Sequence, residues 1–100
     1  MYDESRSLLV FFYSDRSGPA RRMESTIAHL ARKERERVRF RRVDIDERPD
    51  LAARFRIHEV PTLVLVQGKR VVARLDGRVS CPRIERMLEM HLEPVEPVAI

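Results

Sequence analysis

The run from Leu8 to Tyr13 restricts the fold of this chain more than any other feature of the sequence. All of its side chains are apolar or aromatic. A strand without a polar position must be covered on both faces, as the central strands of parallel sheets are. We therefore expect a central parallel strand here, in a sheet that carries helices on both faces.

The rest of the chain supplies those helices and further strands. Pro19 and Pro49 suit the first turn of a helix, and Ser80 can cap a third helix. The expected elements after the first strand are a helix to about residue 36, a strand from Val38 to Ile45, a short helix from Pro49 through Phe55, strands from Thr62 to Val66 and from Arg70 to Leu75, and a helix after Ser80. Gln67-Gly68-Lys69 is typical of an antiparallel hairpin turn.

The resulting order is strand, helix, strand, helix, strand, strand, helix. Parallel strands joined through helices, then a hairpin and a closing helix, predict an α/β fold. We expect a three-layer sandwich, with a central mixed sheet of about four strands and helices on both faces. One domain should cover residues 1–92, and residues 93–100 should form a flexible C-terminal tail, because Pro94 and Pro97 cannot continue the last helix.

The composition excludes several classes of protein. The chain is 43% hydrophobic and 36% charged, and it lacks an uninterrupted apolar stretch of about 18 residues, so we expect a soluble cytoplasmic protein that is not exported and has no membrane association. The single cysteine, Cys81, excludes an internal disulfide and any zinc site that cysteines of this chain could complete alone. The three histidines match no metal-ligand spacing, so we expect neither a metal nor a cofactor.

Positive charge is concentrated between residues 16 and 42, where ten Arg or Lys stand against three Glu. Such an excess can attract a polyanion, and the segment from Arg32 to Arg42 is the candidate surface for nucleic acid. Basic and acidic residues alternate in its first half, however, which is more typical of a self-neutralising surface than of a stripe that follows phosphates. Nucleic acid is therefore the less favoured partner.

The segment from Phe12 to Arg21 resembles the active-site segment of the thioredoxin family, which has Trp-Cys-Gly-Pro-Cys-Lys where this chain has RSGPAR. Three further landmarks follow in the family's order, namely VDID before Pro49, Ile57 before Val60-Pro61-Thr62, and Asp76-Gly77 before Ser80. Together they cover about residues 8–92. The resemblance implies a thioredoxin-like sandwich and a cis peptide bond at Pro61.

The resemblance also implies that the redox centre is missing. In the family, the first cysteine lies at a helix N-terminus as a thiolate and attacks a disulfide, and the second resolves the mixed disulfide. Ser17 and Ala20 take their places, and neither can form a sulfur–sulfur bond. The family's buried acid aligns with Phe11, and its tryptophan aligns with Arg16. We therefore expect no disulfide oxidoreductase activity and no catalytic residue.

The family's client-binding groove is what remains. The resemblance assigns it the residues Arg16, Ser17, Gly18, Pro19, Val60, Pro61, Gly77 and Arg78. Val60 would offer backbone groups to an extended peptide, while Arg16 and Arg78 favour Asp, Glu or a phosphate. The leading hypothesis is a redox-inactive adaptor or chaperone-like module that binds a protein or an extended, preferably acidic, peptide. The oligomeric state is left open.

Two alternative functions depend on the chemistry of a single side chain. Cys81 could serve redox homeostasis as a lone thiol, because a thiol at the start of a helix can be acidified by the helix dipole. Ser17 could be a nucleophile activated by His58, but the sequence offers neither an orienting third group nor an oxyanion hole. A helix N-cap is the simpler role for Ser17, and an unreactive thiol is the simpler role for Cys81.

Overall fold

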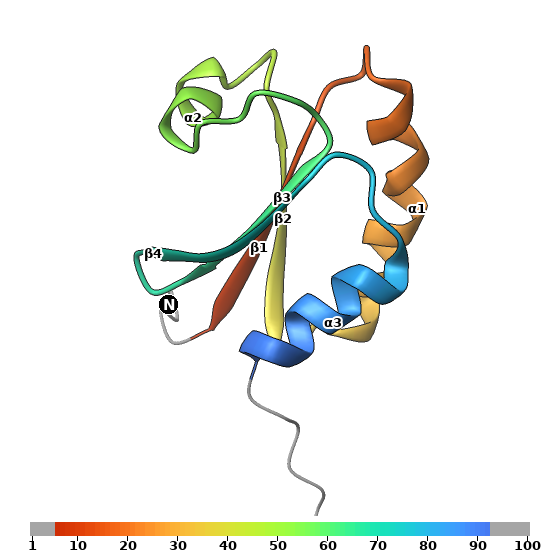
Figure 1. The fold of residues 1–100 in the computed structure, drawn as a ribbon, viewed down its shortest axis with the longest axis vertical. Helices are drawn as coiled ribbons and strands as arrows, with labels where there is room; N and C mark the ends of the chain where they lie inside the picture. Colours follow the sequence, from red (N-terminus) through yellow and green to blue (C-terminus); the bar gives the residue numbers. More distant parts are fainter. Residues whose placement is uncertain (1–5, 93–100) are drawn as a thin grey trace, which may run out of the picture.

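The computed structural model describes residues 6–92 and forms one mixed sheet with helices on both faces (Figure 1). The elements are β1 (Ser7–Tyr13), α1 (Gly18–Lys33), β2 (Val38–Asp44), α2 (Pro49–Arg54), β3 (Thr62–Gln67), β4 (Arg70–Asp76) and α3 (Cys81–His91). The strand order is β2-β1-β3-β4, in which only the β1–β2 pair is parallel. The predicted element order and four-stranded mixed sheet are confirmed. The predicted tail, residues 93–100, lies outside the described residues.

The first strand is covered on both faces, as its composition predicted. Leu9 and Phe11 point to the face that α1 and α3 cover, where they join the buried Leu30, Ile84 and Leu88. Val10 and Phe12 point to the other face, in a smaller cluster that also contains Val43 and Val64. Leu51 and Phe55, in and next to α2, pack against this second cluster. The alternation of side chains along one strand thus builds two cores on one sheet.

Helix α1 ends at Lys33, about one turn before the predicted end. Glu34 is its C-cap and is buried, although a carboxylate is rarely buried without a partner. The guanidinium of Arg37 satisfies it, with Nη2 lying 2.8 Å from Glu34 Oε1. The backbone amides of Arg37 and Val38 also donate to the Glu34 carbonyl. The carboxylate and the carbonyl of Glu34 therefore both bond to the segment that follows, which ends the helix and directs the chain into β2.

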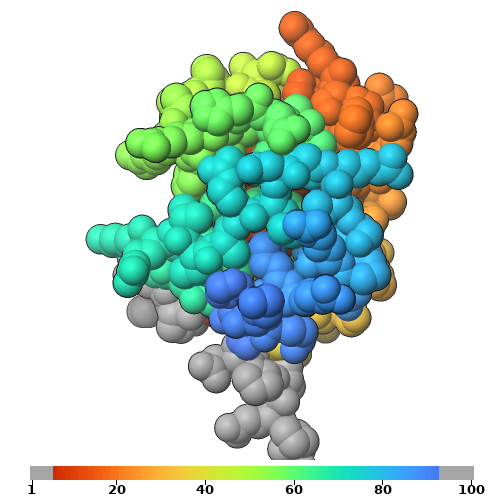
Figure 2. Space-filling view, viewed as in Figure 1, coloured from red at the N-terminus to blue at the C-terminus, as the bar shows by residue number. Residues whose placement is uncertain are grey.

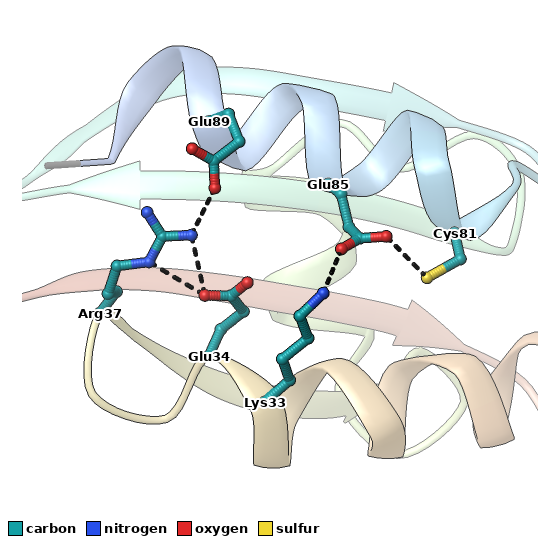
Figure 3. A network of polar contacts seen from close by, with 6 residues as sticks. All are labelled: Lys33, Glu34, Arg37, Cys81, Glu85 and Glu89. Atoms are coloured by element: carbon teal, nitrogen blue, oxygen red, sulfur yellow. Dashed lines mark hydrogen bonds and ion pairs between the residues drawn. The ribbon is translucent and has the colours of Figure 1, made fainter. Parts of the chain in front are cut away.

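Helix α3 is joined to the end of α1 by polar contacts (Figure 3). Lys33 Nζ lies 2.6 Å from Glu85 Oε2, and Arg37 Nη2 lies 2.6 Å from Glu89 Oε1. Lys33 and Glu89 are largely exposed, so their pairs contribute little to the free energy of unfolding beyond positioning. The apolar face of α3, formed by Ile84, Met87 and Leu88 as predicted, supplies most of the contact.

No helix within residues 6–92 is both long and apolar enough to cross a membrane.

Candidate functional site

Ser17 is the N-cap of α1. Its Oγ accepts a hydrogen bond from the backbone amide of Ala20 at 3.2 Å, and its backbone lies in the extended region with φ −98° and ψ 113°. Pro19 occupies the first turn, where its missing N–H costs little. The Ala20 methyl group is buried, whereas Ser17 is only partly covered. The N-cap role predicted for Ser17 is therefore confirmed.

The hydroxyl of Ser17 also donates to the carbonyl oxygen of Val60, at 3.4 Å. The Val60–Pro61 peptide bond is cis, as predicted. The carbonyl of Pro61 in turn accepts from the backbone amide of Gly77 at 2.7 Å, where Gly77 has a φ of +82° that suits glycine. These contacts bring together the three segments that the sequence assigned to the groove, and in Figure 2 the orange, green and cyan parts of the chain meet in the upper half of the view.

Ser14 and Asp46 hold the loop before α1, and sequence reasoning missed this role. Ser14 is buried, and its Oγ donates to Asp46 Oδ2 at 2.6 Å while accepting from the backbone amide of Arg16 at 3.2 Å. The Ser14 carbonyl accepts from the amide of Ser17 at 3.0 Å. The available signal was a small polar residue placed directly after the buried strand, where it begins a turn.

The surface around the three groove segments carries both basic and acidic side chains. Arg16 and Arg78 are exposed, and neither forms an ion pair with another residue of the described part. The Arg22 guanidinium lies beside Gly18, 3.7 Å from where a Cβ would stand, and the Glu59 carboxylate lies 3.6 Å from the same point on Gly77. Glu59 therefore partly offsets the positive charge at the Gly77 end only.

Cys81 lies near the Gly77–Arg78 end of the predicted groove. It shares a hollow of about 310 Å³ with Arg22 and Arg78, and the remaining lining residues are Met23, Thr26, Val79 and Ser80. The hollow lies between α1 and the start of α3, on the side of Gly77–Arg78 that faces α1. A bulky adduct on Cys81 would therefore touch the neighbourhood of Arg78.

The environment of Cys81 opposes the alternative of an acidified thiol and agrees with the simpler role of an unreactive one. Burial raises the pKa of the Cys81 thiol, and so does its hydrogen bond to Glu85, with Sγ 3.5 Å from Oε1 (Figure 3). The charge of Glu85 raises this pKa further, and only Lys33 lowers it. Burial and the carboxylate one helical turn away thus both favour the protonated thiol.

The alternative nucleophile is also without support. His58 is exposed, and within residues 6–92 no hydrogen bond joins it to Ser17. The Ser17 hydroxyl points instead to the Val60 carbonyl, which cannot act as a base. No cluster of three or more metal-binding side chains occurs among the described residues.

Comparison with known proteins gives consistent results. The family model described as Thioredoxin matches residues 1–90. The chain is 28% identical over 90 residues to Thioredoxin 1 of Nostoc sp., covering 90% of this chain and 84% of that protein. It is 30% identical over 74 residues to Thioredoxin-1 of Drosophila yakuba, covering 74% and 69%. The solved structure of Deadhead, a germline-specific thioredoxin of Drosophila melanogaster, superposes with a TM-score of 0.81 at 26% identity, covering 87% and 82%.

Proposed function

Because this chain belongs to the thioredoxin family and has one cysteine and no CxxC pair, we propose that it is a redox-inactive member that binds a partner protein or extended peptide. The binding surface, called here the client groove, consists of Arg16–Pro19, Val60–Pro61 and Gly77–Arg78. Protein disulfide exchange needs one sulfur to attack and a second to resolve the mixed disulfide. The polar atom at Ser17 caps a helix, and Ala20 has no reactive atom.

The observation that carries this proposal is the bonding among the three segments. Ser17 donates to Val60, and Gly77 donates to Pro61, so hydrogen bonds hold the three segments of the client groove together. Among the described residues, none accepts a hydrogen bond from the backbone N–H of Val60. An extended peptide can pair with this N–H and with the Val60 carbonyl, in the manner of an added strand.

The charges of the groove favour an acidic partner. Arg16 lies in the loop before α1, Arg22 lies in α1 and Arg78 lies in the loop after β4. The nearby acidic residues, Asp15 and Glu59, carry less negative charge than these three arginines carry positive charge. Guanidinium groups bind carboxylates and phosphates through two parallel hydrogen bonds. Asp and Glu side chains next to the paired segment of the partner would therefore add both affinity and orientation.

Two alternative functions, a lone-thiol role of Cys81 and nucleic-acid binding by the Arg32–Arg42 surface, have less support. A lone-thiol role requires a reactive thiolate, whereas burial and Glu85 raise the pKa of Cys81. On the Arg32–Arg42 surface, Lys33, Arg37 and Arg42 are paired with Glu85, Glu34 and Glu24 respectively. These pairs reduce the charge available to phosphates, as the alternation of signs in the sequence suggested.

Partner capture tests the groove. The Arg16→Glu, Arg78→Glu double variant should fold normally and lose the partner that wild-type protein retains from a native lysate under reducing conditions. The matched control, Arg54→Glu with Arg86→Glu, makes the same charge change at exposed positions outside the groove and should retain the partner. Retention by both double variants would remove the client groove from the proposal.

Reduction of a model protein disulfide tests the missing redox centre. The wild-type protein should not speed the reduction beyond the rate with dithiothreitol alone, because Ser17 and Ala20 supply no thiolate at the start of α1. The Ser17→Cys, Ala20→Cys variant serves as the positive control, since its two cysteines are spaced i and i+3 at the start of α1. Wild-type turnover that survives Cys81→Ser would contradict the redox-inactive assignment.

A further inference from the structure

A second peptide site is indicated by the outer edge of β2, which is one of the two edge strands of the sheet. The amide of Ile45 donates to the Tyr13 carbonyl at 3.0 Å, in continuation of the parallel β1–β2 register. Because the backbone alternates along a strand, Val43 and Arg41 also direct their N–H and C=O groups toward β1. Phe40 and Arg42 therefore direct theirs outward, and no other described residue bonds to these outward groups.

A hollow lies beside this edge, on the face of the sheet that α1 covers. Its volume is about 720 Å³, and its lining includes the buried Phe11 and Ile27 with the half-buried Phe40. Ala28 and Ala31 of α1 keep it open with small side chains. Phe40 and Arg42 thus contribute both outward backbone groups and side chains that line the hollow. A strand added to this edge would place every second side chain on the same face as the hollow.

The charge around the hollow selects the partner. Its rim carries Arg21, Arg22 and Arg42 against a single carboxylate, Glu24, which is itself paired with Arg42. Arg41 is exposed on the opposite face of the same strand. An exposed edge with arginines on both faces repels a second copy of itself, which is how many proteins prevent edge-to-edge association. The same arginines attract an acidic strand.

We infer that the outer edge of β2 binds an extended segment of a partner protein in which acidic and apolar residues alternate. Its main chain pairs with Phe40 and Arg42, one apolar side chain enters the hollow between α1 and β2, and its acidic side chains meet Arg21, Arg22, Arg41 and Arg42. This site uses a different backbone edge from the client groove, although Arg22 lies near both, and the inference stands whether or not the client groove binds anything.

The probe is a capped synthetic peptide, Asp-Val-Glu-Phe-Glu-Val-Asp, and the readout is amide hydrogen exchange of the intact protein followed by NMR. At a free peptide concentration ten times its Kd, exchange at Phe40 and Arg42 should slow by about tenfold, since only the unbound fraction exchanges. Exchange at Arg41 and Val43 should change little, because their amides already bond to β1. Protection of Val60 in place of Phe40 and Arg42 would overturn the inference.

Two variants locate the site on α1. Ala28→Glu places a carboxylate in the hollow and should weaken peptide binding at least tenfold, a loss of about 1.4 kcal/mol. His29→Glu is the matched control at the neighbouring exposed position, which does not line the hollow, and it should bind the peptide as the wild type does. Equal binding by Ala28→Glu and wild type would contradict the inference.

Two further binding measurements test the role of charge and the distinction from the client groove. The same peptide with Lys at all acidic positions should not bind at millimolar concentration, and equal binding would remove the charge argument. The Arg16→Glu, Arg78→Glu variant should bind the acidic peptide normally, which separates this site from the client groove. Dimerisation of the free protein through β2, seen as a concentration-dependent mass, would assign the edge to a second copy and overturn the proposal.

Discussion

At the scale of single residues, the two side chains that could carry chemistry are used for structure. The Ser17 oxygen accepts from the Ala20 amide and donates to the Val60 carbonyl. Cys81 is the first residue of α3, and its thiol donates to the carboxylate of Glu85, one turn further along the helix. A thiol hydrogen-bonded to a carboxylate is held in its protonated form, which is the opposite of what a nucleophile requires.

The first prediction concerns the pKa of Cys81. The folded-state pKa is raised, so the folded protein favours the protonated thiol; this stabilising contribution is present below the ordinary thiol pKa and is lost as the pH rises through the raised value. Iodoacetamide should therefore alkylate the folded protein more slowly than the unfolded chain near pH 8. Glu85→Gln removes the negative charge beside the thiol and should speed alkylation several-fold at the same pH.

Glu89→Gln is the control for this experiment. Glu89 lies one turn further along α3 and pairs with Arg37, so its loss should leave the alkylation rate of Cys81 unchanged. Alkylation of the folded wild type as fast as that of the unfolded chain would show that the thiol is not protected.

At the scale of elements, α2 depends on a side chain from β4. The helix has only six residues and none of them is buried. The guanidinium of Arg74 donates to the carbonyls of Phe55 and Arg56, at 3.0 and 3.2 Å, and is oriented by Asp76 at 2.9 Å. Arg56 has a φ of +54°, and the amides of Arg56 and Ile57 donate back to the carbonyls of Ala53 and Ala52, which ends the helix. Arg74 thus attaches the end of α2, and the loop that leads to Val60, to the sheet.

The second prediction concerns this attachment. Arg74→Ala should speed amide exchange at Leu51 and Ala52 and lower the free energy of unfolding by about 1 kcal/mol, the usual net value of a hydrogen bond, because water screens these exposed contacts. Exchange followed by NMR and urea unfolding would measure both effects. Arg70→Ala, at the exposed start of the same strand, is the control and should change neither by much. Unaltered exchange in α2 would disprove the attachment.

At the scale of the whole molecule, two cores share one sheet. The larger core contains residues of α1 and α3, and the smaller one lies under α2. Neighbouring residues of β1 and of β3 contribute to different cores; Leu63 and Leu65 face the larger core and Val64 faces the smaller one. Neither core can therefore lose its packing while the central strands remain intact.

The third prediction follows from this shared sheet. Leu88→Ala, at a fully buried position of α3, should lower the free energy of unfolding by about 2–5 kcal/mol, because it removes apolar contacts and leaves a cavity. The methyl groups of Val64, on the opposite face, should report the same urea midpoint as those of Ile84. Met90→Ala, on the exposed side of the same helix, should change the free energy by less than about 0.5 kcal/mol. Separate midpoints for the two faces would contradict a single cooperative unit.

The sequence by itself determined the element order and the mixed sheet. These depend on local features: the uninterrupted apolar run of β1, the prolines at helix starts, the glycine in the hairpin turn, and the serines that cap α1 and α3. Each acts over a few residues, so a linear reading captures it. The cis bond at Pro61 was predictable only through the family resemblance.

The tertiary structure alone decided where α1 ends, how the pKa of Cys81 shifts and which backbone groups of β2 point away from β1. The end of α1 depends on a buried Glu34 that is bonded to Arg37, and the pKa of Cys81 depends on burial and on Glu85. The outward direction of the Phe40 and Arg42 amides depends on the register with β1. All three are set by groups brought together across elements, where burial and hydrogen bonding outweigh the local propensities that a sequence displays.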